Sequence, residues 1–225
     1  MCRRNVSCSP NEAAGLAFAA SANAYDATAD FSTTANPNGA WLYGYSTGDV
    51  SHHDFTLFDK QSGMGWASSG HLASDAPVIW QNTSTATLFG ISTGQLSLHP
   101  VHDTHSWVIL RFVAPAAGGY QVDLGLPNGI WNSNLFLNDG SADPLAYFAS
   151  GSDASSFSGR VSLAQGGHLD IAVVASWSNV HAPPFNTPVT FTVNALPVPE
   201  PTQGLMLGAG LLALAAMSAR RRRAD

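Results

Sequence analysis

The sequence has little cysteine, little charge and little helical periodicity. Its only two cysteines, Cys2 and Cys8, lie within the first ten of 225 residues. The rest of the chain therefore carries neither a disulfide framework nor a thiolate metal site. Charged residues make up 11% of the chain, against about 25% in an average soluble domain. Its polarity comes mainly from Ser, Thr, Asn and Gly, a composition typical of secreted β-proteins.

Positive charge is almost missing from the central part of the chain. Between residues 25 and 197 the sequence has twelve aspartates and no glutamate, and its only Lys or Arg residues are Lys60, Arg111 and Arg160. The formal charge of this body is three minus twelve, or −9. Such a surface repels a phosphate backbone, so the sequence predicts no nucleic-acid binding.

Catalytic motifs are missing as well. The body has no Gly-x-Ser-x-Gly nucleophile elbow, no cysteine and no phosphate-cradling glycine loop. A glycoside hydrolase needs two carboxylates about 5 to 9 Å apart, and aspartates scattered along the body carry no signature of such a pair. The sequence therefore indicates no catalytic residue and no organic cofactor, although hydrolases and lyases are also built on jelly rolls.

The body does contain many short β-type runs separated by Gly, Asn, Asp, Ser and Pro clusters. Runs such as WLYGY, SWVILRFVAP, HLDIAVVAS and VTFTVNA recur from Trp41 onward, and no stretch keeps helical apolar spacing beyond a turn or two. In VTFTVNA, Val189, Phe191 and Val193 alternate with polar residues, as in a strand with one buried face. The pattern predicts an all-β body over residues 25–196, folded as an antiparallel β-sandwich or jelly roll.

Three local predictions follow from these runs. TLFGI, at residues 87–91, is one of the expected strands. In RFVAPAAGGY, Pro115 ends a strand, two glycines turn the chain and Tyr120 begins the returning strand, which predicts a hairpin corner. Arg111 lies in the middle of the first of these strands, and we expect it to pair with an aspartate; a substrate contact is the alternative.

The N-terminus has the layout of a secretory signal peptide. Arg3 and Arg4 give a basic start, residues 13–20 form a small-apolar run, and Ala22-Asn23-Ala24 matches a small-residue cleavage site. Residues 1–24 are therefore expected to direct export and to be removed after Ala24. An ordinary disordered N-terminus is the alternative.

The C-terminus combines three features in a fixed order. An uncharged run of eighteen residues, 202–219, is preceded by Val198, Pro199, Glu200 and Pro201, and is followed directly by Arg220, Arg221, Arg222 and Arg223. Eighteen helical residues span about 27 Å, just short of a hydrocarbon core of about 30 Å. The run predicts a single transmembrane helix at about 203–219, with the arginines in the cytoplasm and the body across the membrane.

This order of features resembles the PEP-CTERM sorting signal of bacteria that produce exopolysaccharide, which is also catalogued as an ice-binding protein C-terminal domain. The sorting signal would occupy residues 197–225. The resemblance implies an exosortase as partner, a membrane-embedded cysteine protease that recognises the Pro-Glu-Pro segment and cleaves there. It also implies that the chain lies transiently in the inner membrane with its body on the periplasmic side, and then reaches the cell envelope or the extracellular matrix.

The body is similar to a β-sandwich ectodomain that often accompanies this tail. The shared positions are Asn36, Pro37, Asn38, Gly39, Trp41, His99, Pro100, Arg111, Pro115, Gly118 and Tyr120. Gly167-His168 stands where that family usually has Gly-Asp. The family has no assigned activity, so the likeness implies a fold and a location and leaves the chemistry open.

Six tryptophans offer a way to bind sugars, because flat aromatic rings stack on pyranose faces. Trp80 and Trp107 lie in strand runs and are expected in the core, whereas Trp131 and Trp177 lie in turn-rich polar segments. Trp131 and Trp177 are the candidates for an exposed platform; capping the ends of the core is the alternative.

The sequence thus favours a non-enzymatic envelope or matrix protein that binds exopolysaccharide. A secreted hydrolase or lyase is the alternative, and would require a deep groove with converging Asp or His side chains.

One cluster of side chains could bind a divalent metal, with ligands His99, His102, Asp103 and His105. His and Asp are suitable ligands for zinc, copper or nickel. The spacing His-x-x-His-x-x-His matches no established ligand motif, and a solvent-exposed loop is the alternative. Apart from this cluster, no cofactor is expected.

Overall fold

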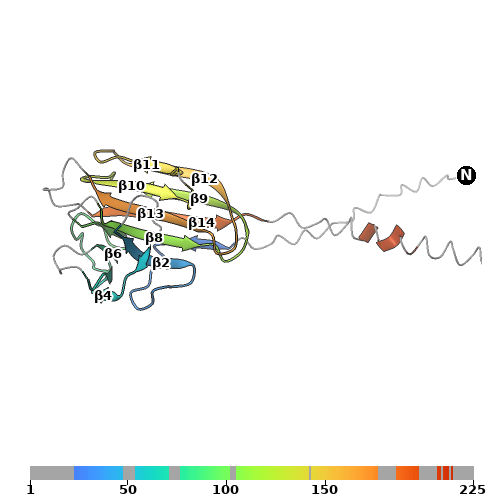
Figure 1. Ribbon diagram of the computed structural model, residues 1–225, viewed down its shortest axis with the longest axis horizontal. Coiled ribbons are helices and arrows are strands. Elements are labelled where there is room, and N and C mark those ends of the chain that lie inside the picture. The colour runs from blue at the N-terminus through green and yellow to red at the C-terminus, as the bar shows by residue number, and fades with distance from the viewer. Residues whose placement is uncertain are drawn as a thin grey trace, which may run out of the picture.

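Fourteen short strands form the body of the protein in the computed structural model (Figure 1). The structure describes residues 23–47, 54–70, 77–101, 105–141, 143–176 and 186–197, together with residues 207, 208, 210–212 and 214. All strand pairs in this part of the chain are antiparallel, and they form two sheets.

The larger sheet has eight strands. Their spatial order is β12 (Ser155–Leu163), β9 (Gly118–Leu126), β14 (Thr187–Ala195), β7 (Leu96–His99), β6 (Val78–Gln81), β5 (Gly65–Ala67) and β4 (Lys60–Ser62), with β1 (Ala24–Asp26) also paired to β14. The smaller sheet has six, in the order β11 (Ala146–Phe148), β10 (Ser133–Asn138), β13 (His168–Ala175), β8 (Trp107–Val113), β2 (Trp41–Ser46) and β3 (Thr56–Leu57).

The two sheets pack face to face around one main core. Val189, Phe191 and Val193 are fully buried in it, as their alternation predicts. Trp41 of the smaller sheet meets Phe191 of the larger one edge to face, with ring centroids 5.6 Å apart. Aromatic contacts of this geometry join the layers, so the predicted antiparallel β-sandwich is confirmed.

The outer face of the smaller sheet is also partly covered. Trp107, Ile109, Ala172 and Val174 form a second buried cluster on this face, against Phe55 and Phe136.

Arg111 pairs with an aspartate on the outer face of the smaller sheet, as predicted. Its Nε and Nη2 donate to the two carboxylate oxygens of Asp170 on the neighbouring strand, each at 2.7 Å. Asp170 is 1% exposed, and the guanidinium lies 4.0 Å from the centre of the Phe55 ring. A bidentate pair in this setting satisfies both charges, so Arg111 has a structural role.

The predicted hairpin at RFVAPAAGGY is wrong, because β8 and β9 belong to different sheets. Pro115 follows the end of β8, but the next strand already starts at Gly118 in the opposite layer. The hydroxyl of Tyr120 donates to the carbonyl of Ala116 at 2.7 Å, and its buried ring packs against Phe112. The chain therefore makes an arch over the end of the core instead of pairing with itself.

The Asn-Pro-Asn-Gly motif shared with the similar ectodomain also has a structural role. The side chain of Asn36 accepts from the backbone N–H of Tyr43 and donates to the carbonyls of Tyr43 and Phe58. Asn38 donates to the carbonyl of Asp30 at 2.7 Å. These bonds fix the loop that leads into β2.

The described chain enters and leaves the sandwich at the same end, because Ala24 in β1 pairs with Asn194 in β14 (Figure 1). Beyond residue 197, Leu207, Gly208, residues 210–212 and Leu214 are helical. No helical segment in the described part of the chain has the length and apolar character that a membrane span requires. The predicted cleavage site for export lies at the start of the described residues, while the Pro-Glu-Pro segment, most of the predicted membrane helix and the arginine cluster lie outside them.

Candidate functional site

Two adjoining hollows form a groove at one end of the sandwich, here called the end groove. The first has a volume of about 410 Å³ and is lined by Ser62, Gly63, Met64, Val78, Trp80, Phe89, His99 and Asn186. The second has a volume of about 490 Å³ and is lined by Phe89, Gly90, Asn128, Gly129, Trp131, Asn186 and Pro188. Phe89 and Asn186 line both hollows, so the two are halves of one groove.

Phe89 stands at the tip of a tight turn. Leu88 and Ile91 exchange two backbone hydrogen bonds of 3.0 and 2.8 Å, while Phe89 and Gly90 between them have φ values of 49° and 81°. These values define a type I′ turn, which prefers Asn, Asp or Gly at both central positions. The prediction of a strand over residues 87–91 is therefore wrong, because the Phe-Gly pair reverses the chain.

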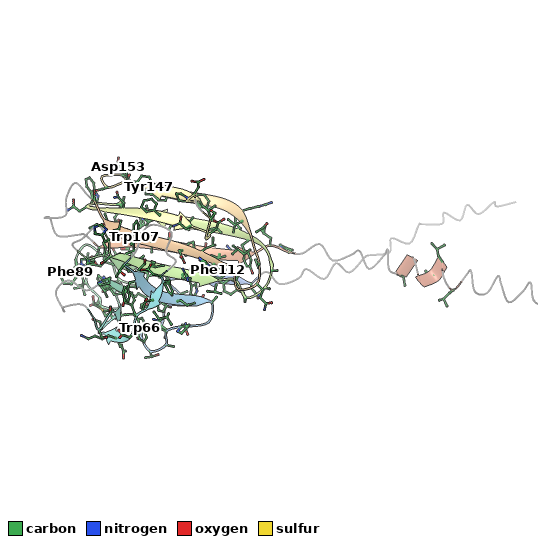
Figure 2. All side chains as sticks on the ribbon, in the orientation of Figure 1. Trp66, Phe89, Trp107, Phe112, Tyr147 and Asp153 are labelled. Atoms are coloured by element: carbon green, nitrogen blue, oxygen red, sulfur yellow. The ribbon has the colours of Figure 1, made fainter. Side chains whose placement is uncertain are left out.

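The backbone of Phe89 is strained, and its ring faces solvent. A left-handed residue other than glycine costs roughly 1–2 kcal/mol, and this side chain is 81% exposed. Figure 2 shows Phe89 at the end of the sandwich away from the place where β1 and β14 meet. Burial therefore does not compensate for the strain at Phe89, which is the pattern expected of a functional position.

Trp80 contributes to the wall of the first hollow. Its ring meets that of Phe89 nearly at a right angle, with centroids 6.2 Å apart, although only 7% of Trp80 is exposed. Its indole N–H donates to Oδ1 of Asn186 at 2.8 Å. The amide oxygen of Asn186 is thus engaged, and its NH₂ group has no hydrogen-bond partner among the residues that the structure places.

A fixed loop presents Trp131. Ile130, directly before it, is buried and bonds through its backbone to Gly151 and Ser152. Gly129 has φ 69°, and a Cβ there would lie 2.2 Å from the carbonyl oxygen of Ser152, so the close approach of the two loops requires glycine. Trp131 itself is 53% exposed. Because the loop is held in place, ordering Trp131 on binding costs little entropy.

The polar side chains that line the end groove are two neutral amides, an imidazole and the hydroxyl of Ser62. Asn128 donates weakly to the carbonyl of Gly90 at 3.5 Å and so links the Trp131 loop to the Phe89 turn. Asn186 and His99 add further polar atoms, and no Asp, Glu, Lys or Arg lines the groove among the described residues. This lining can stack on apolar sugar faces and hydrogen-bond to hydroxyls, but it offers no carboxylate pair for acid–base chemistry.

Of the two tryptophans that the sequence proposes for an exposed binding platform, the structure describes one. Trp131 lies in the end groove, whereas Trp177 lies outside the described residues. Trp80 and Trp107 are buried, as predicted, and Trp80 also reaches the groove.

The proposed metal ligands can be placed only in part. His99 lines the end groove and His105 is exposed, while His102 and Asp103 lie outside the described residues. Among the residues that are described, no group of three or more His, Cys, Asp or Glu side chains is placed to hold an ion.

Three residues of the end groove, Phe89, Asn128 and Asn186, were not among the candidates proposed from the sequence. The available signal for Phe89 is the Phe-Gly pair between two apolar residues, Leu88 and Ile91, which fits a two-residue turn as well as a strand. Asn128 and Asn186 have no such signal, since their position at the groove depends on the packing of distant loops.

No protein-family model and no curated protein matches the sequence. Among solved structures, the chain is similar to a family 35 carbohydrate binding module from Clostridium thermocellum, with 18% identity and a TM-score of 0.31, over 52% of this chain and 96% of that one. It is also similar to the GH26-CBM35 β-(1,4)-mannanase of Podospora anserina, with 17% identity and a TM-score of 0.30, over 56% of this chain and 29% of the mannanase. For tailspike protein 4 of bacteriophage CBA120, the identity is 8% and the TM-score 0.35, over 76% of this chain and 20% of that one.

Proposed function

We propose that the body is a non-enzymatic glycan-binding domain that holds polysaccharide in the end groove. The observation that carries the proposal is the exposed, strained Phe89 beside Trp131. An aromatic ring held in solvent at a cost in stability is compensated when it stacks on a ligand, and a pyranose face is a flat apolar surface of matching size.

The composition of the groove supports a neutral sugar as the ligand. Asn128 and Asn186 can hydrogen-bond to hydroxyl groups, and the described lining carries no cation that would attract a uronate. The two hollows meet at Phe89 and Asn186, which gives room for more than one sugar unit. Exopolysaccharide is thus the proposed partner.

The alternative of a secreted hydrolase or lyase needs a pair of acid–base groups beside the substrate. The described lining of the end groove contains no carboxylate, and His99 alone does not make such a pair. Binding without catalysis therefore fits this groove better.

We further propose that the chain is exported and then sorted by an exosortase through its PEP-CTERM-like tail. The order of the Pro-Glu-Pro segment, the apolar run and the arginines supports this, as does the layout of the N-terminus. The body would lie first on the periplasmic side of the inner membrane, and then in the envelope or the extracellular matrix.

The placement of the groove agrees with such a tether. Asn186 lines the groove directly before β14 begins, and Ala195 ends β14 beside the start of the described chain. Nine residue steps of about 3.3 Å separate the two ends by about 30 Å. A body attached through its C-terminus would therefore present the groove away from the membrane.

Glycan binding is tested with the full chain and a panel of neutral and uronate-containing oligosaccharides of graded length, by calorimetry. We expect Trp131→Ala to weaken binding of a neutral oligosaccharide by about tenfold, because it removes a stacking ring. Tyr147→Ala is the matched control, since Tyr147 is an equally exposed aromatic residue that does not line the groove (51% exposed). Equal losses from both substitutions, or no binding of any neutral sugar, would contradict the proposal.

Sorting is tested by the intact mass and location of the protein in a host that has an exosortase. We expect the native body to appear outside the inner membrane without the residues beyond the Pro-Glu-Pro segment. Pro199→Ala/Glu200→Ala is expected to keep its tail and to stay in the membrane. Retention of the arginine tail in both forms would show that the segment is not a cleavage signal.

A further inference from the structure

Strand β12 forms a long open edge of the larger sheet. It pairs with β9 over nine consecutive residues, from Ser155 opposite Leu126 to Leu163 opposite Gly118, without a bulge. No other strand pairs with β12 in the described part of the chain, so its outer backbone groups are not used in a sheet.

The other sheet edges are protected in ways that β12 is not. Strands β3, β4 and β11 are two or three residues long, and β4 carries Lys60. Short length and lysine are common devices against edge-to-edge pairing. Strand β12 has nine residues, no proline and a single charge, Arg160. A long regular edge of this kind is suited to accept another strand.

The residues of β12 alternate between two faces. Ser156, Ser158 and Arg160 are exposed on the outer face, while Phe157 and Val161 are half-buried and pack against the main core. A strand that pairs with β12 must therefore offer polar residues on one face and apolar residues on the other.

We propose that β12 pairs antiparallel with β12 of a second copy of the chain, centred on Gly159. This register gives full overlap of the nine residues and places Phe157 opposite Val161 on the core side, twice by symmetry. On the outer face it places Arg160 of each copy opposite Ser158 of the other. The strand thus complements itself on both faces, as an isologous interface requires.

A hollow on the outer face next to β12 carries the negative charge of Asp123, and Arg160 of the second copy would lie close to it. Ser158 donates to Asp123 on β9 at 2.6 Å, and both line a shallow hollow of about 260 Å³ together with Ser156, Thr190 and Thr192. Two strand spacings, about 10 Å, separate Asp123 from a residue opposite Ser158 on an added strand. The arginine side chain can cross much of this distance, so its guanidinium would lie in the hollow beside the carboxylate. Within the described chain, Arg160 forms no ion pair of its own.

Pairing is tested with the full chain in detergent by sedimentation equilibrium. We expect a dimer, and we expect Arg160→Asp to raise its dissociation constant by about tenfold or more, because two attractions become repulsions. Asp123→Arg should have the same effect. The combined variant Arg160→Asp/Asp123→Arg should restore association, because it exchanges the two charges and keeps their partners.

Lys60→Asp is the matched control, since it reverses one exposed charge at the opposite edge of the same sheet. Lys60→Asp should leave the dissociation constant of the dimer unchanged. Circular dichroism should confirm that all variants stay folded, as expected for substitutions of exposed residues such as Arg160. A monomer at every concentration measured, a dimer that Arg160→Asp does not weaken, or a combined variant that stays dissociated would each overturn the proposal. Stable capture of a different protein on β12, with no self-association, would overturn it too.

Discussion

Trp41 and Phe89 are both large aromatic residues, yet the fold holds them in opposite ways. Trp41 is 1% exposed, contacts the rings of Phe112 and Phe191, and donates its indole N–H to Asp30 at 3.1 Å. Phe89 is 81% exposed on a left-handed backbone. Burial and a satisfied hydrogen bond stabilise the fold at Trp41, whereas exposure and strain oppose it at Phe89. The core around Trp41 and the end groove around Phe89 should therefore respond differently to substitution.

Trp41→Ala gives the largest expected effect, because it leaves a cavity between the sheets. We expect it to lower the free energy of unfolding by about 3–5 kcal/mol, measured by urea denaturation. Leu57→Ala, at an exposed position of β3, is the control and should change stability by less than about 0.5 kcal/mol. Weaker sugar binding by the folded fraction of Trp41→Ala than by the native chain would contradict the expectation that the core does not affect binding in the groove.

Phe89→Asn should stabilise the protein, whereas Trp41→Ala destabilises it. Asparagine fits the first central position of a type I′ turn, so we expect the free energy of unfolding to rise by about 1 kcal/mol. Binding of a neutral oligosaccharide should fall by about tenfold in the same variant, because the stacking ring is lost. Denaturation and calorimetry on one preparation measure both. A loss of stability would mean that the contact between Phe89 and Trp80 outweighs the backbone strain.

The smallest expected effect is a dependence of stability on pH that arises away from the groove, at His168. Burial lowers the pKa of His168 below its ordinary value of 6.5; Arg111 lowers it further, while Asp170, 3.7 Å away, and Asp139 oppose the shift. The folded state thus binds this proton less readily than the unfolded state. Its contribution to stability is complete above about pH 6.5 and is lost as the pH falls towards the lower folded pKa.

His168→Gln removes this proton-binding group and should flatten the decline in stability below pH 6.5 without changing sugar binding at neutral pH. Urea denaturation at a series of pH values measures the slope. An unchanged slope in the variant would assign the pH dependence to another group.

Much of the fold could be predicted from local patterns in the sequence. The alternation in β14 identifies its buried face, and a body with twelve aspartates and no glutamate makes an aspartate the natural partner of Arg111. Such patterns report burial along one strand. They do not report which sheet the next strand joins, and this is why β8 and β9 were expected to form a hairpin.

The end groove was harder to predict, because it depends on contacts between distant segments. Phe89, Trp131 and Asn186 come from three separate parts of the chain and meet only after the sandwich has formed. The run around Phe89 is short and apolar, so periodicity cannot distinguish a strand from a turn there. Trp131 could be proposed from its turn-rich surroundings, since these alone favour an exposed position.

The direction of the strands gives the proposed pair a further property. Strands β12 and β14 are both antiparallel to β9, so they run in the same direction. Antiparallel pairing through β12 would turn the second copy end for end, and its groove would open at the opposite pole of the assembly. The C-terminal tails of the two copies would point in opposite directions, so both could not be anchored in one bilayer. The two grooves together could instead cross-link two polysaccharide chains. Removal of the tail would then convert a monovalent anchored receptor into a bivalent component of the matrix.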